Sequence, residues 1–243
     1  GLYRTRDGGR TCDHVLFVNE RTGANDVVIA PSDPDVVYAT TWESYPGIAG
    51  PSSGVYKSED GGTTWRRLAG GLPSGERTGR IGLAVSPRDD AKAYVLVDNL
   101  NRGDAPAAEV YRTDDGGATW RRTHKDDLLI FSRIGWYFTD IYLNPQDDEE
   151  VYVLGVRLAR SADGGKTFRH LDGMHADHHG LWIDPANPSY LVRWSSSARA
   201  ETYILERATG PSFGDAERVH AGSATQMTAV SRGIATYHYR VRQ

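Results

Sequence analysis

The stretch His175-Ala-Asp177-His178-His179 holds the densest group of metal-binding side chains in the sequence. Imidazole and carboxylate groups are common ligands for zinc and similar divalent ions. Adjacent residues of a regular strand point to opposite faces, so His178 and His179 share an ion only if they lie in a loop. The alternative, which the unfamiliar spacing favours, is that these histidines form hydrogen bonds to the protein or to a ligand. The sequence requires no cofactor, and a divalent metal is one hypothesis for these four residues.

A second group places aromatic residues beside a carboxylate, in Trp136-Tyr137-Phe138 followed by Asp140. Aromatic faces stack on sugar rings, and carboxylates accept hydrogen bonds from sugar hydroxyls. The alternative is that most of these aromatics are buried in the packing of the fold. The group therefore indicates a carbohydrate site only if the fold exposes the rings.

Glycoside hydrolysis needs two carboxyl groups on either side of the scissile bond, about 5 Å apart for retention and farther apart for inversion. Asp26, Asp140 and Asp177 are the weak candidates for this role, because each stands near the start of an apolar strand. Nothing in the sequence shows that any two of them face each other. The catalytic residues therefore stay unknown at this point.

The elements that position these residues are indicated by an eight-residue repeat. Its form is Ser/Thr-x-Asp-Gly-Gly-x-Thr-aromatic, and its aspartates are spaced by 53, 55 and 48 residues. Asp-Gly-Gly supplies the positive φ angles of a tight hairpin, and the carboxylate accepts N–H groups across the turn. The four copies are Thr5–Cys12, Ser58–Trp65, Thr113–Trp120 and Ser161–Phe168.

A second pattern alternates with the first and consists of an apolar strand, a Pro/Asp turn and another apolar strand. It occurs around Pro31, Pro87, Pro145 and Pro185. Each period therefore carries four strands, two flanking the proline turn and two flanking the Asp-Gly-Gly turn. Four antiparallel strands per repeat of this length predict one blade of a β-propeller.

The predicted fold is all-β, a β-propeller of four-stranded antiparallel blades with about five blades present. Residues 1–243 form a single propeller domain or a propeller fragment. Its parts are a half-blade at 1–20, blades at about 24–70, 79–124 and 138–172, and a degenerate fifth blade with possible closing strands at 180–243.

Two arrangements of the tail stay open. In the first, the strands Met227–Val230 and Tyr237–Val241 complete the N-terminal half-blade and close a five-bladed ring. In the second, the chain is an open piece of a larger propeller. The first residues already read as the third strand of a blade, so we expect an excerpt of a longer protein or a processed product.

The eight-residue repeat resembles the Asp-box, or BNR repeat, of bacterial BNR-repeat glycosyl hydrolase-like proteins, sialidases, xyloglucanase-like hydrolases and sortilin-type propellers. The resemblance implies a propeller whose box residues are structural and lie on the face away from the ligand. The structural aspartates are then Asp7, Asp60, Asp115 and Asp163, with Trp65, Trp120 and Phe168 buried between blades. Cys12 replaces the aromatic in the first copy, where we expect the thiol to be a small buried apolar group.

The resemblance also bears on activity. Sialidases hold the substrate carboxylate with three arginines, whereas the aligned blade starts here contain only Arg80, so sialidase chemistry is not expected. Xyloglucanase-like enzymes usually have two propellers with a cleft between them, and this chain supplies at most one. No catalytic residue is therefore transferred from either family.

The first strand of each blade lines the channel, and its start opens on one face of the ring. Aligning the four turn prolines brings the candidate polar residues to this channel mouth, under two long loops. The acidic run Asp147–Glu150, in contrast, follows a turn proline, and we expect it to be solvated. The predicted ligand-binding residues are Asn25, Asp26, Arg80, Trp136, Tyr137, Asp140, His178 and His179.

Composition limits the remaining classes. The net charge of −4 offers no broad basic surface for nucleic acid, and no apolar run is long enough to span a membrane. Only four of the 28 basic residues are lysines, a bias that indicates a bacterial source with a GC-rich genome. We expect a secreted or periplasmic protein, although this chain contains no signal peptide. A single cysteine excludes an internal disulfide.

Three functions follow from these patterns. The first is recognition of a glycan or polypeptide at the channel mouth. The second is glycoside hydrolysis by carboxylates of the mouth, and the third is a non-catalytic assembly scaffold. The expected partners are a glycan or polypeptide ligand and further blades of a longer parent chain.

Overall fold

The computed structural model describes residues 1–102, 107–173, 175–183, 189–193, 203–208, 217–222, 226–230 and 238–242. The described segments are almost entirely β-strands and turns, with the short 3-10 helix η1 (Leu100–Arg102) after the eighth strand. No helix in these segments is long and apolar enough to cross a membrane.

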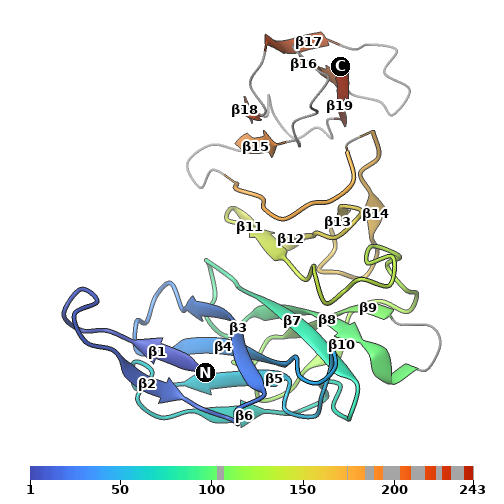
Figure 1. Ribbon diagram of the computed structural model, residues 1–243. Coiled ribbons are helices and arrows are strands. Elements are labelled where there is room, and N and C mark those ends of the chain that lie inside the picture. The colour runs from blue at the N-terminus through green and yellow to red at the C-terminus, as the bar shows by residue number, and fades with distance from the viewer. Residues whose placement is uncertain are drawn as a thin grey trace.

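Three four-stranded antiparallel sheets follow one another along the chain (Figure 1). In each sheet the strands pair in sequence order, so the predicted four-stranded blades are confirmed. The first blade consists of β3 (Thr22–Ile29), β4 (Val37–Glu43), β5 (Gly54–Ser58) and β6 (Arg66–Leu68). The second consists of β7 (Thr78–Val85), β8 (Ala93–Asn99), β9 (Ala107–Thr113) and β10 (Arg121–Arg122), and the third of β11 (Ile141–Asn144), β12 (Asp147–Val153), β13 (Ala159–Ser161) and β14 (Arg169–His170).

The proline turns join the first two strands of a blade as the turn chemistry predicts. After Pro31, the carboxylate of Asp33 accepts a hydrogen bond from the N–H of Asp35 at 3.0 Å. After Pro87, the carboxylate of Asp89 accepts one from the N–H of Ala91, also at 3.0 Å. An aspartate that caps its own turn ends one strand and starts the next.

The two ends of the chain form smaller sheets. β1 (Leu2–Arg4) pairs with β2 (Asp13–Leu16) as a two-stranded hairpin. In the tail, β15 (Ser189–Arg193) pairs with β18 (Gln226–Val230), and β16 (Tyr203–Ala208) lies between β17 (Glu217–Gly222) and β19 (His238–Arg242).

Among the described strands, none from the tail pairs with β1 or β2. Figure 1 shows the β1–β2 hairpin and strands β15–β19 at opposite ends of the molecule. The described tail strands pair with each other instead, and the described sheets do not close into a ring. Pro185 and residues 194–202, on which part of the predicted fifth blade rests, lie outside the described residues.

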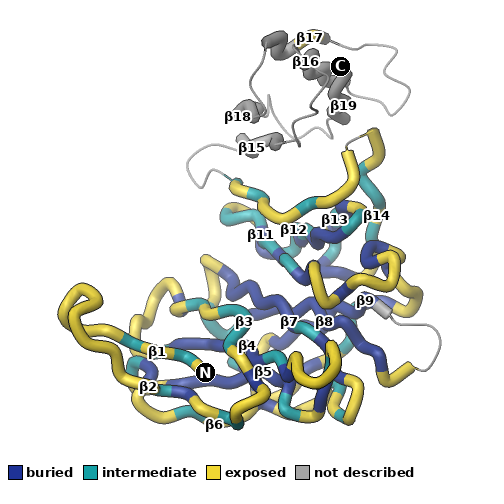
Figure 2. Tube along the Cα trace, in the orientation of Figure 1, coloured by how far each residue is buried: buried dark blue, intermediate teal, exposed yellow. Residues whose placement is uncertain are grey.

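Apolar side chains fill the spaces between consecutive blades, where Figure 2 shows the strands as buried. Tyr38 of the first blade packs in one cluster with Val95 and Trp120 of the second. Phe168 of the third blade packs against a cluster that contains Leu96 of the second blade. The aromatic of each eight-residue repeat therefore packs against the blade that precedes it.

Trp65, in the second repeat, packs against Leu16 and Tyr56, between the β1–β2 hairpin and the first blade.

The first repeat has Cys12 in place of the aromatic residue. Cys12 is exposed, so the expectation of a buried thiol is wrong. The physical reason is its place in the β1–β2 hairpin, which lies at one end of the described blades (Figure 1).

Each eight-residue repeat forms its turn from its own residues. In the second repeat, the carboxylate of Asp60 accepts hydrogen bonds from the N–H groups of Thr63 and Thr64, both at 2.8 Å. It also accepts one from the hydroxyl of Thr64 at 2.6 Å. Gly61 and Gly62 adopt φ angles of 66° and 83°, which residues with a β carbon resist. The aspartates of the other repeats bond Thr11, Thr119 and Thr167 in the same way.

These turns predict a specific response to acid. Hydrogen bonds from Thr11 and Thr119 lower the pKa of Asp7 and Asp115 to about 2, from an ordinary value of 3.8. The unfolded chain binds these protons first, so the stabilisation is present above about pH 4 and is lost as the pH falls towards 2. In thermal melts, Asp115→Asn should be less stable than wild type at about pH 6, and the difference should shrink towards about pH 2.5. Asp172→Asn, which changes an exposed carboxylate, serves as the control. A difference that is constant with pH would contradict this account.

The acidic run Asp147–Glu150 is not a solvated turn, so that expectation is wrong. β12 begins at Asp147, and Asp148 is 8% exposed. The carboxylate of Asp148 lies 2.8 Å from Nζ of Lys92, and that of Glu149 lies 2.6 Å from Nη1 of Arg112. Both cations belong to the second blade, so these acids form an ionic contact between blades.

Candidate functional site

The residues predicted at the channel mouth lie at the starts of β3 and β7 and in the segment before β11. β3 packs beside β7, and β7 packs beside β11. The last contact is very close, since a β carbon added at Gly82 would lie 1.6 Å from the carbonyl oxygen of Thr139. This contact brings Asp140 next to Arg80 and Asp26. We name Asn25, Asp26, Arg80, Asp140 and His179 the rim cluster.

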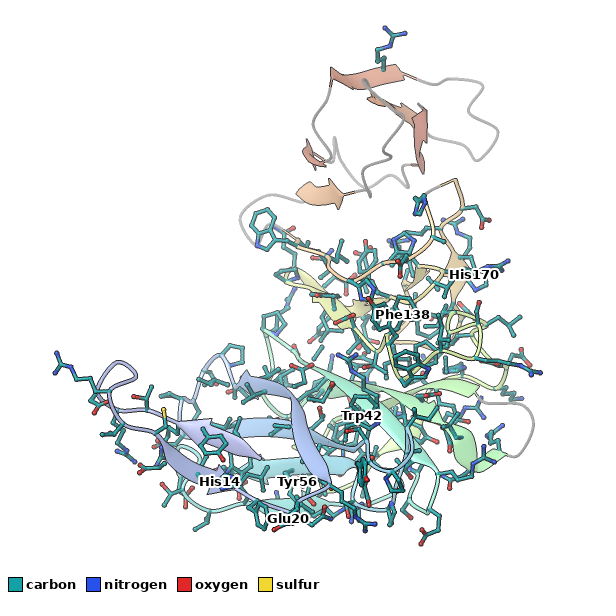
Figure 3. All side chains as sticks on the ribbon, viewed as in Figure 1. His14, Glu20, Trp42, Tyr56, Phe138 and His170 are labelled. Atoms are coloured by element: carbon teal, nitrogen blue, oxygen red, sulfur yellow. The ribbon has the colours of Figure 1, made fainter. Side chains whose placement is uncertain are left out.

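The side chain of Arg80 contacts β3, β4 and the segment before β11. Its Nε donates a hydrogen bond to Oδ1 of Asn25 at 2.5 Å, and its Nη1 donates to the carbonyl of Tyr137 at 3.0 Å. Its guanidinium carbon lies 5.9 Å from the centre of the Trp42 ring. Figure 3 shows Trp42 and Phe138, which flank this region, in the central part of the molecule. The guanidinium is thereby held by an amide, two carbonyls and a ring face rather than by a carboxylate.

Two half-buried carboxylates face this guanidinium. Asp26 accepts hydrogen bonds from the N–H groups of Val27 at 2.9 Å and Leu83 at 3.1 Å. Burial nevertheless raises the pKa of Asp26 above its ordinary value. Burial also raises the pKa of Asp140. The charges of Arg80 and His179 oppose this rise, whereas the charge of Asp26 adds to it. The structure therefore brings Asp26 and Asp140 within electrostatic reach of each other.

The aromatic residues divide between the core and the surface. Phe138 is fully buried, whereas Trp136 and Tyr137 are 38% and 49% exposed. The His179 ring stacks on Phe138 with centroids 4.7 Å apart and meets the edge of Tyr137 at 4.8 Å. Trp136 and Tyr137 thus present ring surface beside the rim cluster, as a carbohydrate site requires.

Tyr142 belongs to this site, and the sequence interpretation missed it. Burial raises its pKa, and the charges of Asp140 and Asp26 add to the rise. Tyr142 is half-buried on β11, while Ile141 and Leu143 are buried. The alternation of Asp140 and Tyr142 with apolar residues was the available signal, because side chains two apart share a face.

The segment His175–His179 lies in an irregular loop rather than in a strand. Asp177 has a φ of 84°, and its Oδ1 lies 3.2 Å from Nε2 of His179. His175 contacts the carbonyl of Ala176, and burial lowers the pKa of His178. In the part of the chain that the structure describes, no three His, Cys, Asp or Glu side chains come together as a metal site. The structure brings only His179 to the rim cluster, and the divalent metal stays a prediction.

Asp98, at the end of β8, lies buried beneath the rim. A β carbon at Gly135 would be 2.3 Å from its Cγ, and one at Gly79 would be 3.0 Å from its Oδ2. The residue is 2% exposed, Oδ2 has no hydrogen-bond partner in the described structure, and burial raises its pKa to about 6. Gly79 precedes Arg80 and Gly135 precedes Trp136, so the side chain of Asp98 packs against the backbone next to both of these residues. In the sequence, the feature that indicates Asp98 is an acidic residue directly after the apolar run Ala93–Val97.

A separate cavity of about 530 Å³ lies between the first and second blades. Val55, Leu68, Ile81 and Val97 form its apolar wall, and Arg67 is its charged residue. None of the rim cluster lines it. The cavity is therefore a gap in the packing between blades and not the mouth itself.

No family model matches the chain, and no curated protein matches it. Solved structures share its fold, among them a GH74 enzyme from Niastella koreensis. The two are 20% identical with a TM-score of 0.54, over 70% of this chain and 26% of that enzyme. An ancestral GH74 enzyme is 15% identical with a TM-score of 0.57, over 90% of this chain and 28% of that one.

The GH74 xyloglucanase from Xanthomonas campestris is 20% identical with a TM-score of 0.53, over 79% of this chain and 32% of that enzyme. At these identities the likeness shows the β-propeller fold alone. The chain spans about a quarter to a third of the length of these enzymes. The Asp-box and sortilin parts of the resemblance, and the expected bacterial origin and export, stay predictions.

Proposed function

We propose that the rim cluster binds a carbohydrate. The observation that carries this proposal is the convergence of two half-buried carboxylates, Asp26 and Asp140, with exposed ring surface from Trp136 and Tyr137 around Arg80. Carboxylates accept hydrogen bonds from sugar hydroxyls, and ring faces cover the apolar face of a pyranose. The fold shared with GH74 enzymes supports this choice over a polypeptide ligand, without identifying the sugar.

The Trp136→Ala variant tests the proposal. Removing the exposed ring should weaken glycan binding about tenfold, because a well-placed aromatic contact contributes about 1 kcal/mol or more. The measurement is isothermal titration with the best ligand from a glycan array. Phe17→Ala removes another exposed aromatic, on the β1–β2 hairpin, and should leave the affinity unchanged. Equal affinity of Trp136→Ala and wild type would reject the rim as the binding site.

Glycoside hydrolysis is the second candidate, favoured by the mutual influence of Asp26 and Asp140. Burial raises the pKa of both groups, and a carboxyl group with a raised pKa can serve as a general acid. Release of reducing sugar that both Asp26→Asn and Asp140→Asn abolish would establish hydrolysis. Saturable binding without release across a broad glycan panel would leave recognition as the function. A chain that binds no glycan would instead be tested with peptides, as a scaffold.

A further inference from the structure

The rim cluster carries more negative than positive charge. The groups that act on one another are the carboxylates of Asp26 and Asp140, the guanidinium of Arg80 and the imidazole of His179. The imidazole of His179 lies 3.2 Å from the carboxylate of Asp177, so the guanidinium of Arg80 is the one cation left to face the two carboxylates. A ligand that binds here without adding negative charge is therefore favoured.

Arg80 does not neutralise either carboxylate directly. In the described part of the chain, its hydrogen bonds go to Asn25 and to the carbonyls of Trp136 and Tyr137. In the described residues, neither Asp26 nor Asp140 forms an ion pair within 4 Å, although many other acids do. Half-buried carboxylates without a paired cation are costly, because burial penalises their charge.

Asp140 is the more open of the two acids. Asp26 uses both oxygens to accept backbone N–H groups, from Val27 and Leu83. No side chain in the described part of the chain donates a hydrogen bond to Asp140. Apart from its own backbone N–H, no group in the described residues donates to its oxygens, which therefore keep acceptor sites for an outside donor. The partly exposed Trp136 and Tyr137 stand four and three residues before it.

From this geometry we infer that the preferred ligand is a glycan with a free amino group, whose ammonium pairs with Asp140 and is attracted by Asp26. This inference rests on the proposed function and names the class of sugar. A charge-assisted hydrogen bond to a carboxylate is about twice as strong as a neutral one, and a nearby ring face adds to the attraction for a cation. Pairing with the carboxylate also favours the charged form of the amine. Acidic sugars are disfavoured by the same charge.

Three tetrasaccharides with one backbone geometry provide the test. These are the β-1,4-linked tetramers of glucosamine, N-acetylglucosamine and glucose, which differ at carbon 2 by an amine, an acetamide or a hydroxyl. Isothermal titration at neutral pH and low ionic strength should give about tenfold tighter binding for the glucosamine tetramer. Added salt should remove most of this preference, because it screens the ammonium–carboxylate attraction.

Variants separate this inference from the proposed function. Asp140→Asn keeps the shape of the side chain and removes its charge, so it should abolish the preference for the amine, measured as the ratio of the affinities for the amine and neutral tetramers. Asp172→Asn, on the loop after β14, should retain the preference. Equal, salt-independent binding of all three sugars by the wild-type chain would overturn the inference and leave carbohydrate recognition standing. Binding of none would overturn the inference, while the glycan array still decides the proposed function. The salt series on wild type decides the inference even if Asp140→Asn fails to fold.

Discussion

Gly82→Ala is expected to lower the free energy of unfolding by about 3 kcal/mol or more, or to prevent folding. Gly82 lies in β7, the inner strand of the second blade. The β carbon of alanine would stand 1.6 Å from the carbonyl oxygen of Thr139. The obstructing atom is backbone, so no change of rotamer relieves the contact. The third blade must move away from the second, and Asp140 moves with it.

Urea unfolding followed by circular dichroism and tryptophan fluorescence measures this effect. Gly23→Ala is the matched control, since Gly23 also lies in an inner strand and an added β carbon there meets nothing within 4 Å. A loss of stability that is equal in the two variants would contradict the close approach of β7 and the third blade. If Gly82→Ala folds, its affinity for the rim ligand should fall as well.

Asp98→Asn should stabilise the protein at neutral pH. Burial raises the pKa of Asp98 from 3.8 to about 6, so the folded protein holds this proton more tightly than the unfolded chain does. The free energy of unfolding of wild type therefore falls as the pH rises from about 4 to 6 and stays lowered above that. The shift corresponds to about 3 kcal/mol. The amide has the shape of the protonated acid and no charge to lose.

The comparison of two pH values isolates this charge. The difference in unfolding free energy between Asp98→Asn and wild type should grow by about 2.5 kcal/mol from about pH 4 to about pH 7.5, since a small part of the effect is already present at pH 4. Any constant cost of burying the amide cancels in this comparison. Asp172→Asn, at an exposed position, should show no such growth. A difference that stays the same at both pH values would show that Asp98 is already paired or solvated.

The elements of the fold were predictable because their signals are local. Asp60 bonds Thr63 and Thr64 within one turn, and the proline turns close over a few residues. The four-stranded blades follow from such turns alone. The pairing of the tail strands could not be predicted from local turns, because β15 pairs with β18 across more than 30 residues of chain.

The site was predictable only in part, for the same reason. Alignment of the turn prolines placed Asn25, Asp26, Arg80 and Asp140 together, because each blade repeats the same geometry. Tyr142 and Asp98 were missed. The first requires knowledge of which face of β11 is exposed, and the second requires the approach of Gly79 in β7 and of Gly135 in the segment before β11. The interpretation of Asp148 failed because its partner Lys92 lies 56 residues away.

The self-contained bonding of the eight-residue repeats has a consequence for how such a chain changes over evolutionary time. The aspartate of each repeat bonds within its own turn, and the first glycine of the three complete blades donates to the proline turn of the same blade, so gene duplication can add a blade, and recombination can exchange one, without rebuilding the turn. The rim cluster, in contrast, depends on the order of the blades, because Asp26, Arg80 and Asp140 come from three successive blades. Insertion of a blade between any two of them would preserve the architecture and disperse the rim. Descendants of one propeller can thus keep their repeats while acquiring unrelated ligands.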